Sequence, residues 1–204
     1  MRKFQHYDFA FQLHIQLLDT KPAIWRRVLV PVDYTFGQLH QVIQQLFAWH
    51  NTHLHTFQLA VLVDNGMDIL TFEPILQDFG PIVDDALDEN LCLLKDYLKI
   101  GHHMQYHYDF GDDWIHEILV EGQIIQLKKQ KYPACIDGGN HHAFEDIGGV
   151  YGYQNTVDIL MNPNHDQHKD LKAWLKDVYG AAKINKFDPT FFDAKKIKFS
   201  SFSS

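Results

Sequence analysis

Cysteine is scarce in this chain. Cys92 and Cys135 are the only two among 204 residues, and Cys92 lies in the apolar run Leu91–Leu94. That setting is typical of a small buried side chain. Two unrelated cysteines argue against the disulfide framework of small secreted domains. The cysteine content favours a reducing compartment, and we expect the protein to be cytoplasmic.

Long apolar runs are missing as well. No stretch approaches the ~18 apolar residues that a membrane-spanning helix requires. The segment from Met1 to Asp8 lacks the apolar core of a secretory signal. We therefore expect neither export nor insertion into a membrane.

Positive charge is in short supply. The sequence has 18 Lys and Arg against 26 Asp and Glu, which gives a net charge of −8. Sequence-independent nucleic-acid binding depends on Lys and Arg that neutralise phosphates, so this balance argues against it. A local basic patch around Lys21, Arg26 and Arg27 stays open, and so does a protein partner.

Apolar residues, by contrast, are plentiful. Hydrophobic residues make up 46% of the chain and aromatic residues 14%, which is enough for a well-filled core. The length suits one large domain. We expect residues 1–194 to form a single domain and residues 195–204, which are small, polar and basic, to form a flexible C-terminal tail.

Two kinds of periodicity predict the fold class. Residues 9–17 alternate between apolar and polar, which predicts a half-buried strand, and a second strand over residues 24–32 follows after a short turn. Thr35 and Gln38 form a capping box, and apolar residues then recur at helical spacing as far as Phe47. The pattern predicts a helix over about 35–49.

The rest of the chain alternates between strands and helices in separate blocks. Further strands are expected over residues 54–63, 67–72, 104–110 and 114–122, and C-terminal helices from about Gln154 to before Pro163 and from Asn164 or Asp166 to Gly180. Residues 73–89 resemble an acidic surface excursion, and residues 128–152 a long loop. Together these elements predict an α+β fold: a mostly antiparallel β-sheet with the 35–49 helix packed on a face and C-terminal helices closing the domain.

The densest polar cluster lies where the 104–110 and 114–122 strands meet. Its candidate catalytic residues are Asp109, Asp112, Asp113 and His116. Carboxylate oxygens are the ligands of hard cations such as Mg²⁺, which makes metal-dependent catalysis one interpretation. The alternative is structural: Asp112 and Asp113 cap the turn, while Asp109, expected on a strand, pairs with Arg26 or Arg27.

Two histidine-containing segments are candidate metal sites. Cys135, His141 and His142 lie in a glycine-rich loop and offer ligands that zinc prefers, although a zinc site needs about four. A structural loop, or a Cys135 nucleophile assisted by a histidine, are the alternatives. His53 and His55, two residues apart on an expected strand, project to one face, where they could share a metal or bond to loop carbonyls.

Glycines follow Glu145 and Asp146 and lead into a helix. Gly148 and Gly149 would let backbone amides approach an anionic ligand at the helix N-terminus. The alternative is that these glycines only meet the demand for positive-φ turns.

Four segments, taken in order, resemble the plasmid pRiA4b ORF-3-like family. They are Ile24–Val28 with the helix that follows, His53–Phe57, Tyr108–Glu117, and Tyr132–Cys135 continuing to Glu145–Gly149 and Gly152–Tyr153. The resemblance covers about Tyr7 to Phe192. It implies a compact α+β fold and an association with plasmids and mobile elements, without an established activity.

The resemblance also points to candidate binding residues and to one segment where this chain differs from the family. Its segments supply the candidate binding residues Trp25, Arg26, Arg27, Trp114, Glu145 and Asp146. His142 stands where the family usually has a second cysteine, and Ala143–Phe144 replaces two prolines. A Cys-to-His exchange is compatible with a zinc ligand and equally with a position under no chemical demand.

Two hypotheses follow for function. The first is a non-enzymatic accessory or binding domain of a mobile element, whose interaction face is formed by the Tyr106–Glu117 hairpin and the Cys135–Gly149 loop. The second is a metal-dependent hydrolase or nuclease-like enzyme that uses the aspartates and nearby histidines with zinc or magnesium as cofactor. Convergence of the hairpin turn, the histidines and the loop in one pocket would favour the second.

Overall fold

The computed structural model describes residues 8–64, 66–75, 80–128 and 130–200. Its centre is a single sheet of eight strands in the order β5-β4-β3-β6-β7-β1-β2-β8. The strands are β1 (Phe9–Leu17), β2 (Ile24–Pro31), β3 (His55–Val63), β4 (Gly66–Glu73), β5 (Leu87–Asp88), β6 (His103–Tyr108), β7 (Trp114–Ile125) and β8 (Ala134–Gly139). Neighbouring strands are antiparallel except for the short β4–β5 pair. The mostly antiparallel sheet is therefore confirmed.

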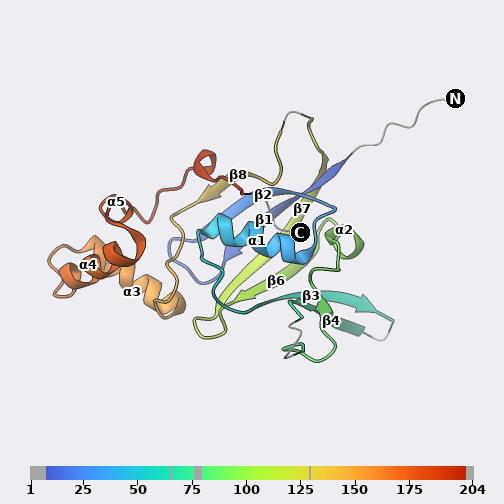
Figure 1. Ribbon diagram of the computed structural model, residues 1–204, viewed down its shortest axis with the longest axis horizontal. Helices are drawn as coiled ribbons and strands as arrows, with labels where there is room; N and C mark the ends of the chain where they lie inside the picture. The colour runs from blue at the N-terminus through green and yellow to red at the C-terminus, as the bar shows by residue number, and fades with distance from the viewer. Residues whose placement is uncertain (1–7, 65, 76–79, 129, 201–204) are drawn as a thin grey trace.

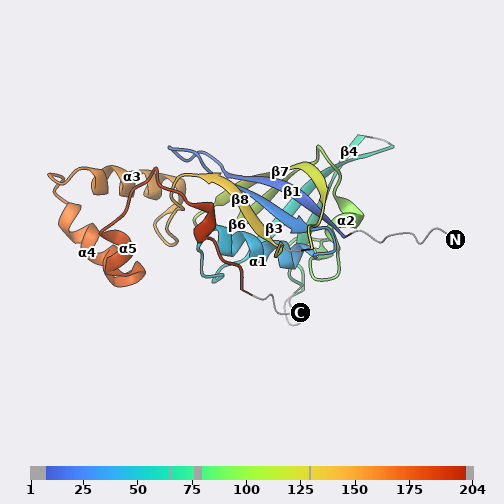
Figure 2. The ribbon, with the colours of Figure 1, turned by 90° about the horizontal axis from the view of Figure 1, so that it is seen from above.

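Helix α1 (Phe36–Phe47) lies across one face of the sheet (Figures 1 and 2). Thr35 caps its first turn, since the Thr35 side chain accepts from the Gln38 amide and the Gln38 side chain accepts from the Thr35 amide. Its apolar side chains are fully buried against the inward-facing side chains of the central strands. Ala48 ends the helix in the left-handed conformation.

The C-terminal helices lie beyond one end of the sheet (Figures 1 and 2). They are α3 (Gly149–Met161), α4 (His168–Tyr179) and α5 (Ala181–Ile184); a short α2 (Leu94–Tyr97) and a 3₁₀ turn η1 (Ala194–Lys196) complete the set. Phe144, Leu175 and Ile184 form a small second core among them. The predicted α+β architecture is confirmed. Among the described residues no helix is long and apolar enough to cross a membrane.

Strand β8 lies within the segment that was expected to be a loop. It pairs with β2 at the sheet edge, where Trp25 lies opposite Gly139 and Arg26 opposite Gly138. A Cβ atom at Gly138 would collide with the Phe192 ring, and one at Gly139 with the Trp25 indole. The sequence shows no alternation here because two of the six positions must lack a side chain.

Two further segments differ from expectation. Helix α3 begins at Gly149 rather than near Gln154, because Gly148 and Gly149 adopt positive φ angles of 83° and 66° and turn the chain into the helix. Residues 73–89 are not purely a surface excursion: Glu73 and Glu89 at its ends are buried, and residues 76–79 lie outside the described part. Residues 195–200 run along α1, where Ser200 bonds to Gln45; residues 201–204 lie outside the description.

Candidate functional site

The turn between β6 and β7 holds Asp109 in an unusual conformation. The residue does not lie on a strand, as expected, but follows β6 with a positive φ of 57°. Its Oδ1 atom accepts hydrogen bonds from the amides of Gly111 (3.0 Å) and Asp112 (3.4 Å). Asp109 Oδ1 therefore caps the turn, and Oδ2 takes no part in these two hydrogen bonds.

That second oxygen faces a histidine and another aspartate. The Nε2 atom of His53, in the connection between α1 and β3, lies 3.5 Å from Asp109 Oδ2 and 3.1 Å from Asp146 Oδ1. One ligand atom from each of these three side chains lies within 4.8 Å of the other two. Asp109 is buried, whereas the Asp146 side chain is 67% exposed, so the group opens to solvent on one side.

One hydroxyl group holds together the residues that precede the three side chains. Tyr108 OH accepts a hydrogen bond from the Thr52 amide (3.1 Å) and donates one to Glu145 Oε1 (2.7 Å). Thr52 precedes His53, Tyr108 precedes Asp109, and Glu145 precedes Asp146. The burial of this hydroxyl and its Glu145 partner raise the pKa of Tyr108. The Tyr108 hydroxyl thus joins three segments that are distant in the sequence, and in each segment the candidate ligand is the next residue along the chain.

Glu145 is the anchor of the third segment. It is 1% exposed, and its Oε2 atom accepts from the His50 amide (2.8 Å) and lies 2.6 Å from His50 Nδ1. Its backbone carbonyl accepts from Tyr179 OH of α4 at 2.7 Å. Glu145 was a candidate binding residue, but its carboxylate is committed to internal hydrogen bonds that position Asp146.

The ligand set suits a divalent metal ion. One imidazole nitrogen with two carboxylate oxygens matches the donors that Zn²⁺ and Mn²⁺ accept, and the imidazole makes Mg²⁺ a poorer match. Three protein ligands leave coordination positions for water or substrate, which is the arrangement of catalytic rather than structural sites. Fixed loop residues with positive φ, 57° at Asp109 and 55° at Asp146, are common where geometry serves a site.

A second polar cluster lies behind the first and is buried. The rings of His40 and His55 stack with centroids 3.5 Å apart. His55 Nε2 lies 2.8 Å from Glu89 Oε2, and His40 Nε2 lies 2.7 Å from Asn51 Oδ1. Burial lowers the pKa of His40 to about 3 and of His55 to about 4, and it raises the pKa of Glu89 to about 7. At neutral pH both imidazoles are therefore uncharged.

A cavity of about 240 Å³ is lined by the second cluster and by one residue of the first. Its lining includes His53 of the first cluster and His40, Asn51, His55 and Glu89 of the second. Gly37 and Asn90 complete one wall, where the Gly37 amide bonds to the Glu89 carbonyl at 3.1 Å. This volume lies below the about 300–1,000 Å³ of sites for drug-sized molecules, so the cavity has room only for a smaller molecule. Of the candidate metal ligands, His53 lies in its lining.

The other hairpin candidates have different surroundings. Asp112 accepts from the Gly148 amide at 3.3 Å and so links the turn to the start of α3. Asp113 lies 2.7 Å from His107 Nε2 on the outer side of the turn. His116 is fully buried between Phe47, Trp49 and Tyr106, and burial lowers its pKa to about 3. The structure brings only Asp109 of this set to His53.

The two histidines of the expected pair have different partners, although both line the cavity of about 240 Å³. His53 lies before β3 and faces the aspartates, while His55 begins β3 and is buried against Glu89.

The zinc candidates of the glycine-rich loop are also not gathered. His141 Nδ1 lies 2.8 Å from the His142 carbonyl, and His142 Nδ1 lies 3.0 Å from the Ala143 carbonyl. Cys135 lies on β8, with its sulfur 3.5 Å from the Asp137 carbonyl. Across the described ranges, these three residues do not form a ligand group within 4.8 Å.

The basic and aromatic binding candidates divide into buried and half-buried residues. Arg26 is 1% exposed, donates to the Gly139 carbonyl (2.8 Å), and lies 3.9 Å from the centroid of Phe192. Arg27 pairs with Glu121 (2.6 Å) and Asp137 (3.2 Å) rather than with Asp109, which corrects the expected pairing. The indole of Trp25 stacks on His14, and Trp114 is fully buried beside Trp49.

Sequence reasoning missed His40 and Glu89. His40 lies next to Leu39 on the buried face of α1, so a lone histidine in the apolar stripe was an available signal. The sequence predicts that Glu89 lies in a surface excursion. Its burial follows from two backbone contacts, Gly37 to the Glu89 carbonyl (3.1 Å) and Glu89 to the Glu73 carbonyl (3.0 Å), which no local pattern reveals.

Comparison with known proteins places this chain among relatives without known function. The chain is 32% identical over 176 residues to the uncharacterised protein y4hQ of Sinorhizobium fredii, a match that covers 85% of both proteins. It is 31% identical to a crystallised protein of unknown function, MM3350 of Methanosarcina mazei, with a TM-score of 0.79 over 95% of this chain and all of that one. Residues 9–196 match the family described as plasmid pRiA4b ORF-3-like protein, and the chain belongs to that family.

Proposed function

We propose that this chain binds a divalent metal ion through His53, Asp109 and Asp146, and that the ion activates water to hydrolyse a small polar substrate held in the adjoining cavity. The observation that carries the proposal is the group of three ligand atoms, from three loops, within 4.8 Å of one another. The hairpin turn, the His53 segment and the Cys135–Gly149 loop each contribute one of them.

The supporting structure favours a prepared site over a chance encounter of polar side chains. Asp109 is oriented because its other oxygen accepts two backbone amides. Tyr108 OH ties the residue before His53 to the residue before Asp146. Such outer hydrogen bonds orient metal ligands and tune their basicity.

The adjoining cavity supplies groups for proton transfer. A bound divalent ion would lower the pKa of a water ligand towards neutrality. Glu89, with its pKa raised by burial to about 7, can take or give a proton near neutral pH, and its hydrogen bond to His55 fixes it in the cavity wall. His40 packs against His55 and holds that ring in place.

A non-enzymatic binding domain of a mobile element is the second candidate. The observation in its favour is that Asp112 and Glu145 are used in internal hydrogen bonds, as structural carboxylates would be. In that case a metal at the three-residue site would stabilise the interaction face formed by the hairpin and the loop, without turnover.

Metal binding is tested first, by isothermal titration of chelator-treated, untagged full-length protein with ZnCl₂ and with MnCl₂. We expect one ion per chain. Asp109→Asn keeps the Oδ1 acceptor of the turn but removes the charge on Oδ2, and we expect it to weaken binding at least ~100-fold. Asp113→Asn, in the same turn but outside the group, is the matched control and should bind normally. Absence of binding to the wild-type chain refutes the metal site.

Hydrolysis is tested separately with p-nitrophenyl acetate and bis(p-nitrophenyl) phosphate. Turnover should require the metal and disappear in Asp109→Asn. Glu89→Gln should retain metal binding while losing at least ~10-fold in rate, since general acid–base groups contribute about 10²–10⁴-fold. Tight metal binding with no turnover of either ester would favour the binding domain over the hydrolase.

A further inference from the structure

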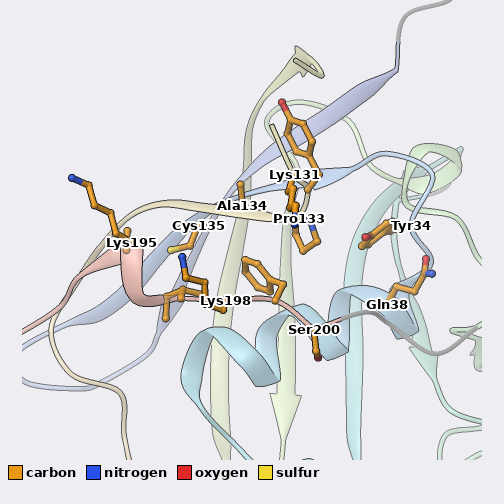
Figure 3. A pocket seen from close by; sticks show the side chains of 13 residues that line it. Tyr34, Gln38, Lys131, Pro133, Ala134, Cys135, Lys195, Lys198 and Ser200 are labelled. Carbon is orange, nitrogen blue, oxygen red and sulfur yellow. The ribbon is translucent and has the colours of Figure 1, made fainter. Parts of the chain in front are cut away.

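A larger cavity lies on the other side of α1, away from the three-residue site. It has a volume of about 660 Å³ and is bounded by the start of α1, by β8 with the segment before it, and by residues 194–200 (Figure 3). This volume lies within the range of small-molecule sites, about 300–1,000 Å³. None of the side chains in its wall belongs to the proposed metal site.

The charged side chains in the described walls of this cavity are all positive. Lys131, Lys195 and Lys198 line it, and none of the described residues in its lining is an aspartate or glutamate, although the chain as a whole carries a net charge of −8. In Figure 3 the amine of Lys198 points towards the sulfur of Cys135, while the Lys195 side chain extends outward at the rim. The remaining polar groups are uncharged and come from Tyr34, Gln38, Tyr132, Cys135 and Ser200.

Positive potential also reaches the cavity from beneath. Arg26 is buried close to Cys135, and its guanidinium donates hydrogen bonds to the Trp25 and Gly139 carbonyls; in the part of the chain that the structure describes it has no carboxylate partner. Burial raises the pKa of the Cys135 thiol to about 11, so the thiol adds no negative charge at neutral pH. An anion in this cavity would meet cationic side chains without a competing carboxylate.

The other part of the lining is apolar and held in place. Pro133, Ala134, Ile197 and Phe199 form it, and Ile197 and Phe199 pack against the main core. Ser200 bonds to Gln45 of α1 through both its amide (2.7 Å) and its hydroxyl (3.1 Å). The C-terminal wall is therefore built into the fold rather than resting loosely on it.

We propose that this cavity binds an organic anion: a molecule whose phosphate or carboxylate is held by Lys131 and Lys198 and whose aromatic or apolar body lies against Pro133 and Phe199. The acid group gives specificity through charge, and the body gives affinity through burial of apolar surface. Both parts are required, so inorganic phosphate alone should bind far more weakly.

The test uses a pair of fluorescent probes that differ in charge. 1-Anilinonaphthalene-8-sulfonate carries an acid group, and N-phenyl-1-naphthylamine has the same aromatic body without it. The folded full-length protein should bind the sulfonate at one site at least ~10-fold more tightly than the neutral probe. Phenyl phosphate and phenylacetate, added as competitors, distinguish a phosphate ligand from a carboxylate ligand, and inorganic phosphate should not compete at the same concentration.

Charge reversal locates the site. Lys131→Glu with Lys198→Glu should weaken sulfonate binding at least ~10-fold and leave the neutral probe unchanged. The matched control is Lys169→Glu with Lys172→Glu on α4, which changes the net charge equally and should stay within ~2-fold. Amide shifts of Ala134, Ile197 and Phe199 on sulfonate binding, followed by NMR, should mark this cavity. Equal losses in both double variants, or shifts confined elsewhere, overturn the proposal.

Discussion

The hydroxyl of Tyr108 donates a 2.7 Å hydrogen bond to the buried carboxylate of Glu145. This bond joins β6 to the loop before α3 across 37 positions in the sequence, and both partners immediately precede a candidate metal ligand. The carboxylate would otherwise be buried with one oxygen lacking this donor, which is costly in a protein interior.

Removing that hydroxyl should cost both stability and metal affinity. Tyr108→Phe leaves the Thr52 amide and Glu145 Oε1 without their partner, so we expect a loss of about 1–3 kcal/mol in the free energy of unfolding. Metal affinity should fall about 10-fold because the ligand segments lose their connection. Urea denaturation and metal titration measure the two effects. Tyr151→Phe, whose side chain is 91% exposed, is the control, and equal effects in both variants would contradict this role.

Gly149 should not tolerate a side chain. Its φ is +66°, and a Cβ atom there would collide with the Asp112 carbonyl oxygen. We expect Gly149→Ala to lower the free energy of unfolding by about 3 kcal/mol through backbone strain and the displaced turn. Gly101→Ala has a similar backbone demand, with φ +88° and open space around the Cβ position, and should cost only about 1 kcal/mol. Equal losses of unfolding free energy in the two variants would show that backbone strain alone is responsible and that the collision with Asp112 adds nothing.

Arg26 and Arg27 are sequence neighbours with opposite roles, so their alanine variants should differ sharply. Arg26→Ala removes the hydrogen bonds that a buried guanidinium donates to backbone carbonyls and its contact with Phe192, and we expect a loss of about 3 kcal/mol or more. Arg27→Ala removes partly exposed ion pairs with Glu121 and Asp137, which are worth about 0–1 kcal/mol. Urea denaturation of both variants decides between these roles.

Glu89 should make stability depend on pH in a recognisable direction. Burial raises its pKa from 4.5 to about 7, so between these values the folded chain holds a proton that the unfolded chain has released. The contribution of Glu89 is complete below about pH 4.5 and is lost as the pH rises through 7. Glu89→Gln, which cannot ionise, should therefore gain stability relative to the wild type as the pH rises from 5 to 8, by roughly 2 kcal/mol.

Glu121 supplies the contrasting control for that measurement. Its hydrogen bond with Arg27 lowers the pKa of Glu121 to about 2, so its contribution is present above pH 4.5 and is lost as the pH falls through 2. Glu121→Gln should thus be less stable than the wild type by an amount that is constant from pH 5 to 8. Parallel pH profiles for the two glutamine variants, measured by urea denaturation, would refute the assignment of Glu89.

Much of the fold could be predicted because its signals are local. Alternation in β1 and the capping box of Thr35 and Gln38 each depend on a few adjacent residues. β8 could not be found this way, because Gly138 and Gly139 are required by contacts with Phe192 and Trp25 rather than by a strand pattern.

The candidate site shows the same division between local and distant causes. His53, Asp109 and Asp146 were each named from the sequence but in three separate segments, since their proximity depends on the Tyr108 hydroxyl. Alternation continues through Asp109 and predicts that it lies on a strand, whereas its own side chain ends the strand by capping the turn.

The link from Thr52 through Tyr108 to Glu145 has a consequence for how the molecule forms. It spans separations of 56 and 37 residues, so no isolated hairpin or loop contains more than one of the candidate ligands. An ion at the proposed site could be bound only after β6, the end of α1 and the loop before α3 have met. The rate at which a refolding chain binds metal would therefore report when these three segments come together.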